Sequence, residues 1–161
     1  MTSSTPTHDD VHDHKPPPLV VAASNIVLKR ILRTSLARKI NSIALLSFTG
    51  RRSGRSLSVV VGWHTLDGVA TIFTPASWKA NFTDPAPATM RHRHHQLHLV
   101  GTLTTDPSTV ADALNRLISS GTTPRALALQ VPTGHKITAA DVTAVRRSMI
   151  QFSTATPTVA D

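Results

Sequence analysis

Apolar residues change their spacing along the chain, and the changes predict which stretches are helical and which are extended. Between Ser24 and Ile40 the apolar positions recur at helical spacing, and Ser24 or Asn25 can cap the start of a helix there. Ile43–Phe48 is a short apolar run, which is typical of a buried strand. Residues 56–63 alternate between apolar and polar positions, as expected for a strand with one buried face.

Turn-forming residues divide the rest of the chain. Leu66-Asp67-Gly68 predicts a hairpin turn, with Val69–Thr74 as the returning strand. Pro75–Phe82 predicts one or two helical turns, and residues 88–103 predict one or two more strands.

Two helices are predicted in the last third of the chain. Asp106 caps the first, Pro107 opens it and Gly121 ends it. Thr138 and Asp141 resemble the front of a capping box. That second helix would bear Val142, Val145 and Met149.

This order of elements predicts an α+β fold with an antiparallel sheet or small barrel. The 161 residues suit one domain of ordinary size. Residues 1–18 end in a triple proline and hold few large apolar side chains, so we expect a disordered tail there. We expect the domain over residues 19–152 and a second tail over residues 153–161.

Composition excludes several kinds of chemistry. The nine acidic residues are all Asp, and the chain has no Glu, Cys or Tyr. Disulfides, thiolate metal sites and cysteine nucleophiles are therefore impossible, and a catalytic carboxylate pair would have to come from scattered Asp residues. No apolar run reaches the roughly 18 residues of a membrane-spanning helix. The N-terminus has no signal-peptide pattern, so we expect a cytoplasmic location.

Positive charge gathers in the first half of the chain. The formal net charge is +8, yet no acid occurs from Leu19 to Leu66. That stretch holds eight bases: Lys29, Arg30, Arg33, Arg38, Lys39, Arg51, Arg52 and Arg55. The excess implies an anionic partner, which could be a phosphate, an acidic cofactor, a nucleic acid or a membrane surface. The basic helix over residues 24–40 would suit the inner face of a membrane, although packing on the barrel explains its apolar stripe more simply.

The basic turn between the first two strands is the sharpest local feature. It reads Thr49-Gly50-Arg51-Arg52-Ser53-Gly54-Arg55. Glycine permits positive φ and close approach of an anion to the backbone, and arginine side chains can form paired hydrogen bonds with phosphate oxygens. The turn is therefore either a phosphate-sized cradle or a solvated basic hairpin. It lacks the spacing and the Lys-Ser/Thr ending of a Walker A loop.

This turn, the Asp-Gly hairpin and the segment Trp78-Lys79-Ala80-Asn81-Phe82 follow one another in an order that resembles a known family. The stretch from Ile26 to Ile118, and most strongly Ile43–Phe82, is similar to the deazaflavin-dependent nitroreductases. These belong to the flavin/deazaflavin oxidoreductases of split β-barrel fold. The resemblance implies an antiparallel split barrel with an N-terminal helix and flanking C-terminal helices.

The resemblance also implies a cofactor and a reaction. The family binds coenzyme F420, a deazaflavin with a phosphodiester and an acidic tail, or in some branches FMN. Reduced cofactor would pass a hydride to a small hydrophobic acceptor: a quinone, a nitro compound or an activated alkene. The protein would supply position, dryness and electrostatics, and no catalytic side chain or metal is implied.

Residues of this chain take cofactor-binding roles by the same match. The basic turn would hold the phosphate and the tail: Thr49, Gly50, Arg51, Arg52, Ser53, Gly54 and Arg55. The strand after it would line the ring: Val59, Val60 and Val61. The next loop would offer backbone donors to the ring, from Thr74, Pro75, Ala76 and Ser77. Trp78 and Asn81 would close the pocket.

Other interpretations stay open at this stage. A single strand would place His92, His94 and His98 on one face, with His95, Arg91 and Arg93 on the other. Arginines between the histidines disfavour a metal ion, so we expect a solvated, pH-sensitive edge strand. His64 could lie near the ring or at the surface of the hairpin, and Trp63 is expected in the core.

A non-catalytic binding module, either a cofactor carrier or a basic nucleic-acid-binding domain, is the alternative function. Only six aromatic residues are present for base stacking, and no helix-turn-helix or zinc pattern occurs, which weighs against nucleic acid. Split barrels of this kind often dimerise while some are monomeric, so a homodimer is an open expectation. Pro132–Lys136 is a turn that could cap the pocket.

Overall fold

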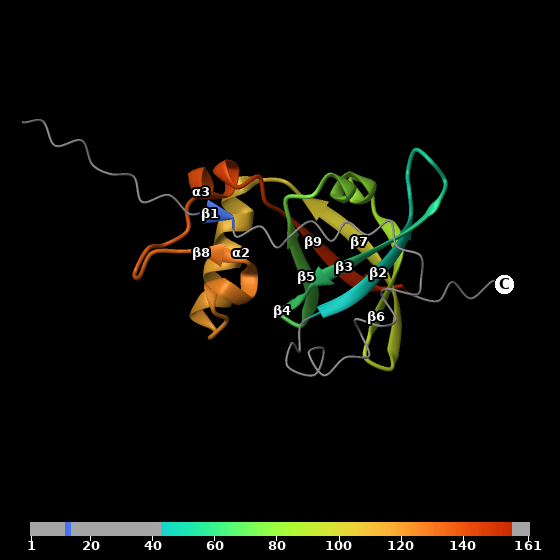
Figure 1. Cartoon of the computed structure of the whole chain (residues 1–161), viewed down its shortest axis with the longest axis horizontal. Coiled ribbons are helices and arrows are strands. Elements are labelled where there is room, and N and C mark those ends of the chain that lie inside the picture. Colours follow the sequence, from blue (N-terminus) through green and yellow to red (C-terminus); the bar gives the residue numbers. More distant parts are fainter. Residues whose placement is uncertain (1–11, 14–42, 156–161) are drawn as a thin grey trace, which may run out of the picture.

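The computed structural model describes residues 12–13 and 43–155, and the helix predicted from Ser24 to Ile40 lies outside them. Figure 1 shows a curled sheet with a small helical lobe beside it. The elements in chain order are β1 (His12–Asp13), β2 (Ile43–Thr49), β3 (Ser56–Gly62), β4 (His64–Leu66), β5 (Val69–Thr74), the 3₁₀ helix η2 (Ser77–Phe82), β6 (Ala86–His92), β7 (His95–Thr104), α2 (Pro107–Ser119), the 3₁₀ helix η3 (Pro124–Leu127), β8 (Leu129–Gln130), α3 (Ala139–Ala144) and β9 (Ser148–Thr154).

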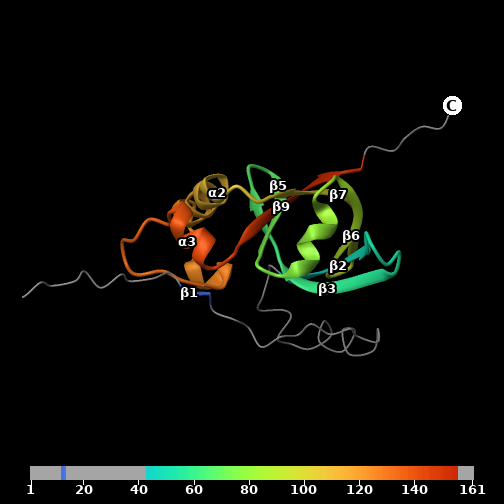
Figure 2. The same cartoon turned by 90° about the horizontal axis from the view of Figure 1, so that it is seen from above.

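One antiparallel sheet of seven strands forms the body of the domain. Its order is β3-β2-β6-β7-β9-β5-β4, and every neighbouring pair is antiparallel. The sheet curls until β3 approaches β5, so it forms a barrel that is open along one side (Figure 2). The predicted α+β fold with a split-barrel-like sheet is confirmed, and α2 and α3 are its flanking C-terminal helices.

The concave face of the sheet holds one hydrophobic core. Alternate residues of the strands point inward, because successive side chains of a strand leave on opposite faces. Phe82 of η2 is fully buried at one end of this core, where its ring lies 5.1 Å from that of Phe48 and 5.7 Å from that of Phe152. The buried members of this inner core are Ala44, Leu46, Phe48, Val61, Ile72, Phe82, Ala88, Met90, Leu99, Ile150 and Phe152.

The helical lobe packs on the other face of β5 and β9 and forms a second core. α2 begins as the sequence predicts, since the Asp106 carboxylate accepts a hydrogen bond from the Thr109 amide at 2.8 Å and Pro107 occupies the first turn. An ion pair between Arg116 of α2 and Asp67 of the β4–β5 turn adds a polar link between lobe and sheet. This outer core contains Leu66, Phe73, Val110, Ala111, Ala113, Leu114, Leu117, Leu127, Leu129, Ile137, Val142 and Met149.

The last predicted helix is shorter than its sequence suggests. The capping box at Thr138 and Asp141 is confirmed, but α3 ends at Ala144 and Arg146 takes a positive φ of 53°. Met149 is therefore not helical, and the prediction that it belongs to this helix is wrong. It lies in β9, which pairs with both β5 and β7 in the middle of the sheet. Because β9 is buried on both faces, its short apolar run has no period that distinguishes strand from helix.

Two predicted tails contain described strand residues. β1 consists of His12 and Asp13, which pair antiparallel with Gln130 and Leu129 of β8. At the other end β9 continues through Thr154. These pairings give the backbone of both segments partners within the fold.

Gly101 of β7 allows the aromatic packing of the inner core. A Cβ at this position would lie 2.6 Å from Cδ1 of Phe82 and 2.7 Å from Cε1 of Phe152. We expect Gly101→Ala to lower the free energy of unfolding by about 1–3 kcal/mol, since overpacking forces rigid rings to move. Urea unfolding measures this, and Thr102→Ala, at the exposed neighbour on the same strand, should change it by less than about 0.5 kcal/mol.

Asp141 makes the lobe sensitive to acid. It is 5% exposed, and its carboxylate accepts hydrogen bonds from His135 Nε2 and the Thr138 amide, both at 2.8 Å. Burial alone raises the pKa of Asp141, but the hydrogen bonds from His135 and Thr138 outweigh it and hold the pKa below its ordinary value of 3.8.

Since the folded-state pKa of Asp141 is depressed, its contribution to stability is present above pH 3.8 and is lost as the pH falls through the folded-state value. Asp141→Asn should lower the free energy of unfolding at pH 7 by about 1–3 kcal/mol, because it removes the charged acceptor. The difference between the two proteins should shrink in unfolding curves taken at successively lower pH. A pH-independent difference would contradict this role for the carboxylate.

Candidate functional site

The basic turn projects from one end of the sheet, and its shape is set by its own backbone. The Gly50 amide donates to the Arg55 carbonyl and the Gly54 amide donates to the Gly50 carbonyl, each at 2.8 Å. Ser53 Oγ accepts from the Arg55 amide at 3.2 Å. Gly54 has a φ of +64°, in the region that favours glycine. The turn is therefore a closed loop that presents exposed side chains from Arg51, Arg52 and Arg55.

A single asparagine joins this turn to η2. Asn81 Oδ1 accepts a hydrogen bond from the Arg51 amide at 2.7 Å, and Asn81 Nδ2 donates to the Trp78 carbonyl, also at 2.7 Å. Both η2 and the turn lie at the same end of the sheet (Figure 1). The turn and the Trp78–Phe82 segment, which the sequence offers as two separate motifs, are thus one structural unit.

A cluster of three aromatic rings connects this unit to the inner core. The Trp78 ring lies 5.7 Å from Phe48 and 6.3 Å from Phe82. Phe48 and Phe82 are buried in the inner core, whereas Trp78 is half-buried. Trp78 therefore packs part of its ring against the core and leaves the rest of it exposed.

Four of the six backbone amides from Gly50 to Arg55 have hydrogen-bond acceptors, three of them within the turn and one on Asn81. Those of Gly50, Arg51, Gly54 and Arg55 have the acceptors given above. Among the described residues, the amides of Arg52 and Ser53 have no acceptor. An anion would consequently meet two backbone donors at the tip of the turn, together with the three guanidinium groups.

Asp84 lies beside the basic turn, although no sequence pattern marks it as a site residue. Its carboxylate lies 3.1 Å from the Arg51 guanidinium, and both side chains are mostly exposed, at 76% and 56%. Such an exposed pair contributes little to stability. Its proximity to the turn follows only from the fold, because a loop aspartate 33 positions after Arg51 carries no local signal.

The valines predicted to line the ring lie on both faces of β3. Val59 and Val61 point to the inner core, and Val61 is only 7% exposed. Val60 is half-buried on the other face, opposite Leu45 of β2. β3 is an edge strand of the sheet. A ring could therefore lie along this edge, but it could not contact all three valine side chains on one face.

The loop from Thr74 to Ser77 offers fewer donors than the sequence suggests. Pro75 has no amide hydrogen, and the Ala76 amide donates to Thr74 Oγ1 at 3.1 Å. Thr74 itself is buried. Within the described part of the chain, the Ser77 amide has no hydrogen-bond acceptor, so it is the backbone donor that this loop leaves available.

The prediction that His92, His94 and His98 share one face of a strand is wrong, because a turn divides the histidines between two strands. Arg93, at a φ of +54°, and His94 form a turn between β6 and β7, so that His92 pairs with His95 across the hairpin. His98 faces Thr89 on the convex side, with 3.4 Å between Nδ1 and Oγ1. No local pattern predicts this turn, because it has none of the Gly, Asn or Asp residues typical of hairpins. No group of three or more metal-ligating side chains occurs over residues 43–155.

Trp63 and His64 lie away from the basic turn. Trp63 packs against the inner core with its ring 5.5 Å from that of His92, which confirms its prediction as a core residue. His64 is half-buried and lies on the face of β4 that meets the helical lobe, 6.5 Å from the Phe73 ring. Burial, and secondarily the positive charge of Arg147, lowers the pKa of His64. His64 is therefore part of the contact between sheet and lobe.

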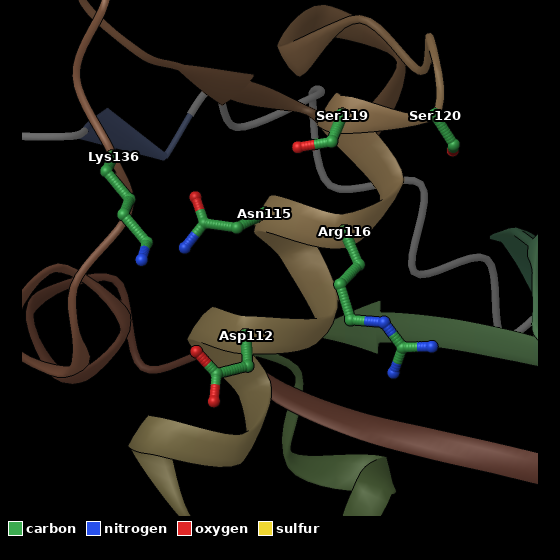
Figure 3. A pocket seen from close by; sticks show the side chains of 6 residues that line it. All are labelled: Asp112, Asn115, Arg116, Ser119, Ser120 and Lys136. Atoms are coloured by element: carbon green, nitrogen blue, oxygen red, sulfur yellow. The ribbon is translucent and has the colours of Figure 1, made fainter.

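A shallow hollow of about 760 Å³ lies on the lobe, and it is built from other residues (Figure 3). Asn115 on its floor is already engaged, since its side chain bonds both backbone groups of Ile137 at 2.7 and 3.0 Å. Arg116 is paired with Asp67. The lining residues are Asp112, Asn115, Arg116, Ser119, Ser120 and Lys136. The hollow is a wide, open depression with mixed charges, and none of the predicted cofactor-binding residues lines it.

The fold and this end of the sheet define an α+β protein with a split-barrel-like sheet and a basic, aromatic-backed turn. No protein-family model matches the chain, and no curated protein is similar to it in sequence. None of the helices described here is long and apolar enough to cross a bilayer.

Similar folds occur among solved structures. One is a conserved hypothetical protein, Rv2991, from Mycobacterium tuberculosis, at 12% identity over 83% of this chain and 82% of that one, with a TM-score of 0.49. Another is described as an F420 reductase, at 11% identity over 72% of this chain and 88% of that one, with a TM-score of 0.42. The fold class given above follows from the strand order and register of this chain alone.

Gly54 provides a test of the turn's geometry. Its φ of +64° is costly for a residue with a Cβ, although no atom lies within 4 Å of the place a Cβ would take. Gly54→Ala should therefore lower the free energy of unfolding by about 1 kcal/mol through backbone strain alone. Gly54→Asn should cost less, because Asn tolerates this conformation better. Equal stability of all three proteins in urea would show that the turn relaxes to another conformation.

Proposed function

We propose that this protein is an oxidoreductase that uses reduced coenzyme F420, or alternatively FMN, to reduce a small hydrophobic acceptor. The observation that carries the proposal is the hydrogen bond from the Arg51 amide to Asn81. It unites the two motifs that resemble the deazaflavin-dependent nitroreductases into one surface. That surface combines exposed positive charge with a half-buried tryptophan, which suits a ligand that has an anionic tail and a flat ring.

The residues present fit the anionic part of such a cofactor. Arg51, Arg52 and Arg55 are exposed, and a guanidinium group can donate two parallel hydrogen bonds to a phosphate or carboxylate. The Arg52 and Ser53 amides add backbone donors. Only one carboxylate, that of Asp84, forms an ion pair with the turn among the described residues. In this proposal Arg51, Arg52 and Arg55 bind the phosphate and the acidic tail.

Trp78 and the edge of β3 bind the ring in the same proposal. The half-buried indole, backed by Phe48 and Phe82, excludes water from one side of the reaction site. When bound, the reduced cofactor supplies the hydride for a quinone, a nitro compound or an activated alkene. This chemistry needs no protein nucleophile and no pair of carboxylates, in agreement with a chain that has no Glu, Cys or Tyr.

The same proposal includes a cellular location and partners. We expect a cytoplasmic enzyme, with the basic segment over residues 24–40 available for the inner face of a membrane and with homodimerisation open. A cofactor carrier without turnover would bind the same ligand through the same residues. A basic nucleic-acid-binding domain would use the turn for the DNA backbone instead.

Cofactor binding is the first test. Addition of the purified protein to F420 or FMN should quench the cofactor's fluorescence, with a dissociation constant in the micromolar range or below. Turnover with the reduced cofactor and a quinone or a nitroarene would then distinguish an enzyme from a carrier. Binding of duplex DNA with steep salt dependence, and of neither cofactor, would contradict the proposal.

Removal of two arginines tests the role of the turn. Arg51→Ala/Arg52→Ala should raise the cofactor KM at least about tenfold, since hydrogen bonds to charged groups are lost, and should change kcat much less. The double variant Arg91→Ala/Arg125→Ala removes the same charge from exposed positions elsewhere and serves as the control. A KM raised equally in both variants would mean that net charge, and not the turn, attracts the cofactor.

A further inference from the structure

Asn81 lies between the two halves of the candidate site and is bonded to both. Its acceptor atom holds the Arg51 amide, 30 positions away in sequence, and its donor atoms hold the Trp78 carbonyl. Both bonds are 2.7 Å long. Because both ends of the carboxamide are used on backbone groups, this side chain fixes the spacing between the turn and η2 without needing to contact a ligand.

The bond to Arg51 is close to the place where an anion would bind. The Arg51 amide belongs to the peptide group that directly precedes that of Arg52, and the Arg52 and Ser53 amides are those without acceptors among the described residues. The two peptide groups share the Cα of Arg51, so anchoring the first restricts where the second can lie. Asn81 therefore influences how the two free donors point.

A second link between the turn and the η2 segment is of a different kind. The Arg51 guanidinium pairs with Asp84, just after η2, across 3.1 Å. This pair is exposed, and an anion on the turn would compete with Asp84 for the same guanidinium group. The bond from Asn81 to the Arg51 amide is neutral and involves no group that the anion needs. An anion on the turn would thus replace the ionic link and leave the Asn81 link in place.

The other end of Asn81 leads to the aromatic cluster. Its donor bond fixes the backbone of Trp78, whose ring contacts Phe48 and Phe82. Phe48 and Phe82 are buried and cannot shift easily, whereas Trp78 is half-buried and has room to do so. A change in the turn would therefore appear as a change in the position of the Trp78 ring.

We propose that Asn81 is a positioning residue that couples anion binding at the basic turn to the position of the Trp78 ring. The inference rests on the proposed function in one respect, since the anion is taken to be the phosphate and acidic tail of the cofactor. The coupling would make the site specific for cofactors that carry a phosphate. A deazaflavin or flavin without a phosphate would bind without setting Trp78 in place, because nothing would engage the turn.

Inorganic pyrophosphate is the probe for this coupling, and the emission of Trp78 is the readout. The chain has two tryptophans, so Trp63→Phe leaves Trp78 as the single reporter. Trp63→Phe leaves no hydrogen-bonding group unsatisfied, because the buried Trp63 Nε1 has no acceptor among the described residues. Pyrophosphate should shift the emission of this protein saturably.

Asn81→Ala in the same background should abolish the shift in emission. It should also weaken pyrophosphate binding, measured by calorimetry, by about three- to tenfold, the effect of losing one hydrogen bond. Asn115→Ala is the matched control, since Asn115 likewise bonds a distant backbone, that of Ile137, but on the helical lobe. Its emission shift and affinity should equal those of the parent.

Asn81→Asp separates the coupling from simple loss of folding. The carboxylate keeps an acceptor for the Arg51 amide but has no donor for the Trp78 carbonyl. It should keep the turn in place and still lose the emission shift, even where Asn81→Ala folds poorly. Pyrophosphate affinity should fall in this variant because the added negative charge opposes the anion.

Three outcomes would overturn the coupling: an emission shift that persists in either Asn81 variant, pyrophosphate binding without any shift in the parent, or no pyrophosphate binding at all. The proposed function fails separately. If neither F420 nor FMN binds while pyrophosphate still moves Trp78 through Asn81, the cofactor assignment is wrong and the coupling stands. If F420 binds and pyrophosphate shifts the emission of Asn81→Ala as it does that of the parent, the coupling is wrong and the cofactor assignment stands.

Discussion

The domain depends on β9 being covered on both faces. This last strand lies between β5 and β7, and its successive residues belong to two separate cores. Met149 points to the helical lobe, while Ile150 and Phe152 point into the curled sheet. A strand buried in this way forms only when both layers are present, so the lobe and the barrel stabilise each other through it.

This arrangement leaves one end of the sheet available for chemistry. The lobe occupies the convex side of β5 and β9, whereas the basic turn and η2 lie at the end that the lobe does not cover (Figure 1). The aromatic rings of Phe48, Trp78 and Phe82 make the transition from core to surface there. A rigid base with a charged rim is a suitable platform for a ligand that is flat at one end and anionic at the other.

Local signals predicted the elements whose stability is local. Asp106 and Pro107 start α2 where expected, Thr138 and Asp141 form the capping box, and Asp67-Gly68 makes the β4–β5 turn. Capping and tight turns depend on residues three or four positions apart, which sequence displays directly. β9 was missed because it is held by β5 and β7, which are distant in sequence. The β6–β7 turn was missed because Arg93 and His94 are not residues typical of hairpin turns.

The same division applies to the candidate site. Its chemistry is evident in the residues alone: two glycines and three arginines in one turn, a tryptophan and an asparagine some thirty residues later, and no thiol, phenol or glutamate anywhere in the chain. The sequence thus determined which kinds of atoms are available and which reactions are excluded. Only the tertiary structure decided that Asn81 bonds Arg51, that Asp84 competes for its side chain, and that Val59 and Val61 face away from Val60. The reason is physical: composition sets charge and donor type, whereas the distance between two segments depends on the packing of the strands between them.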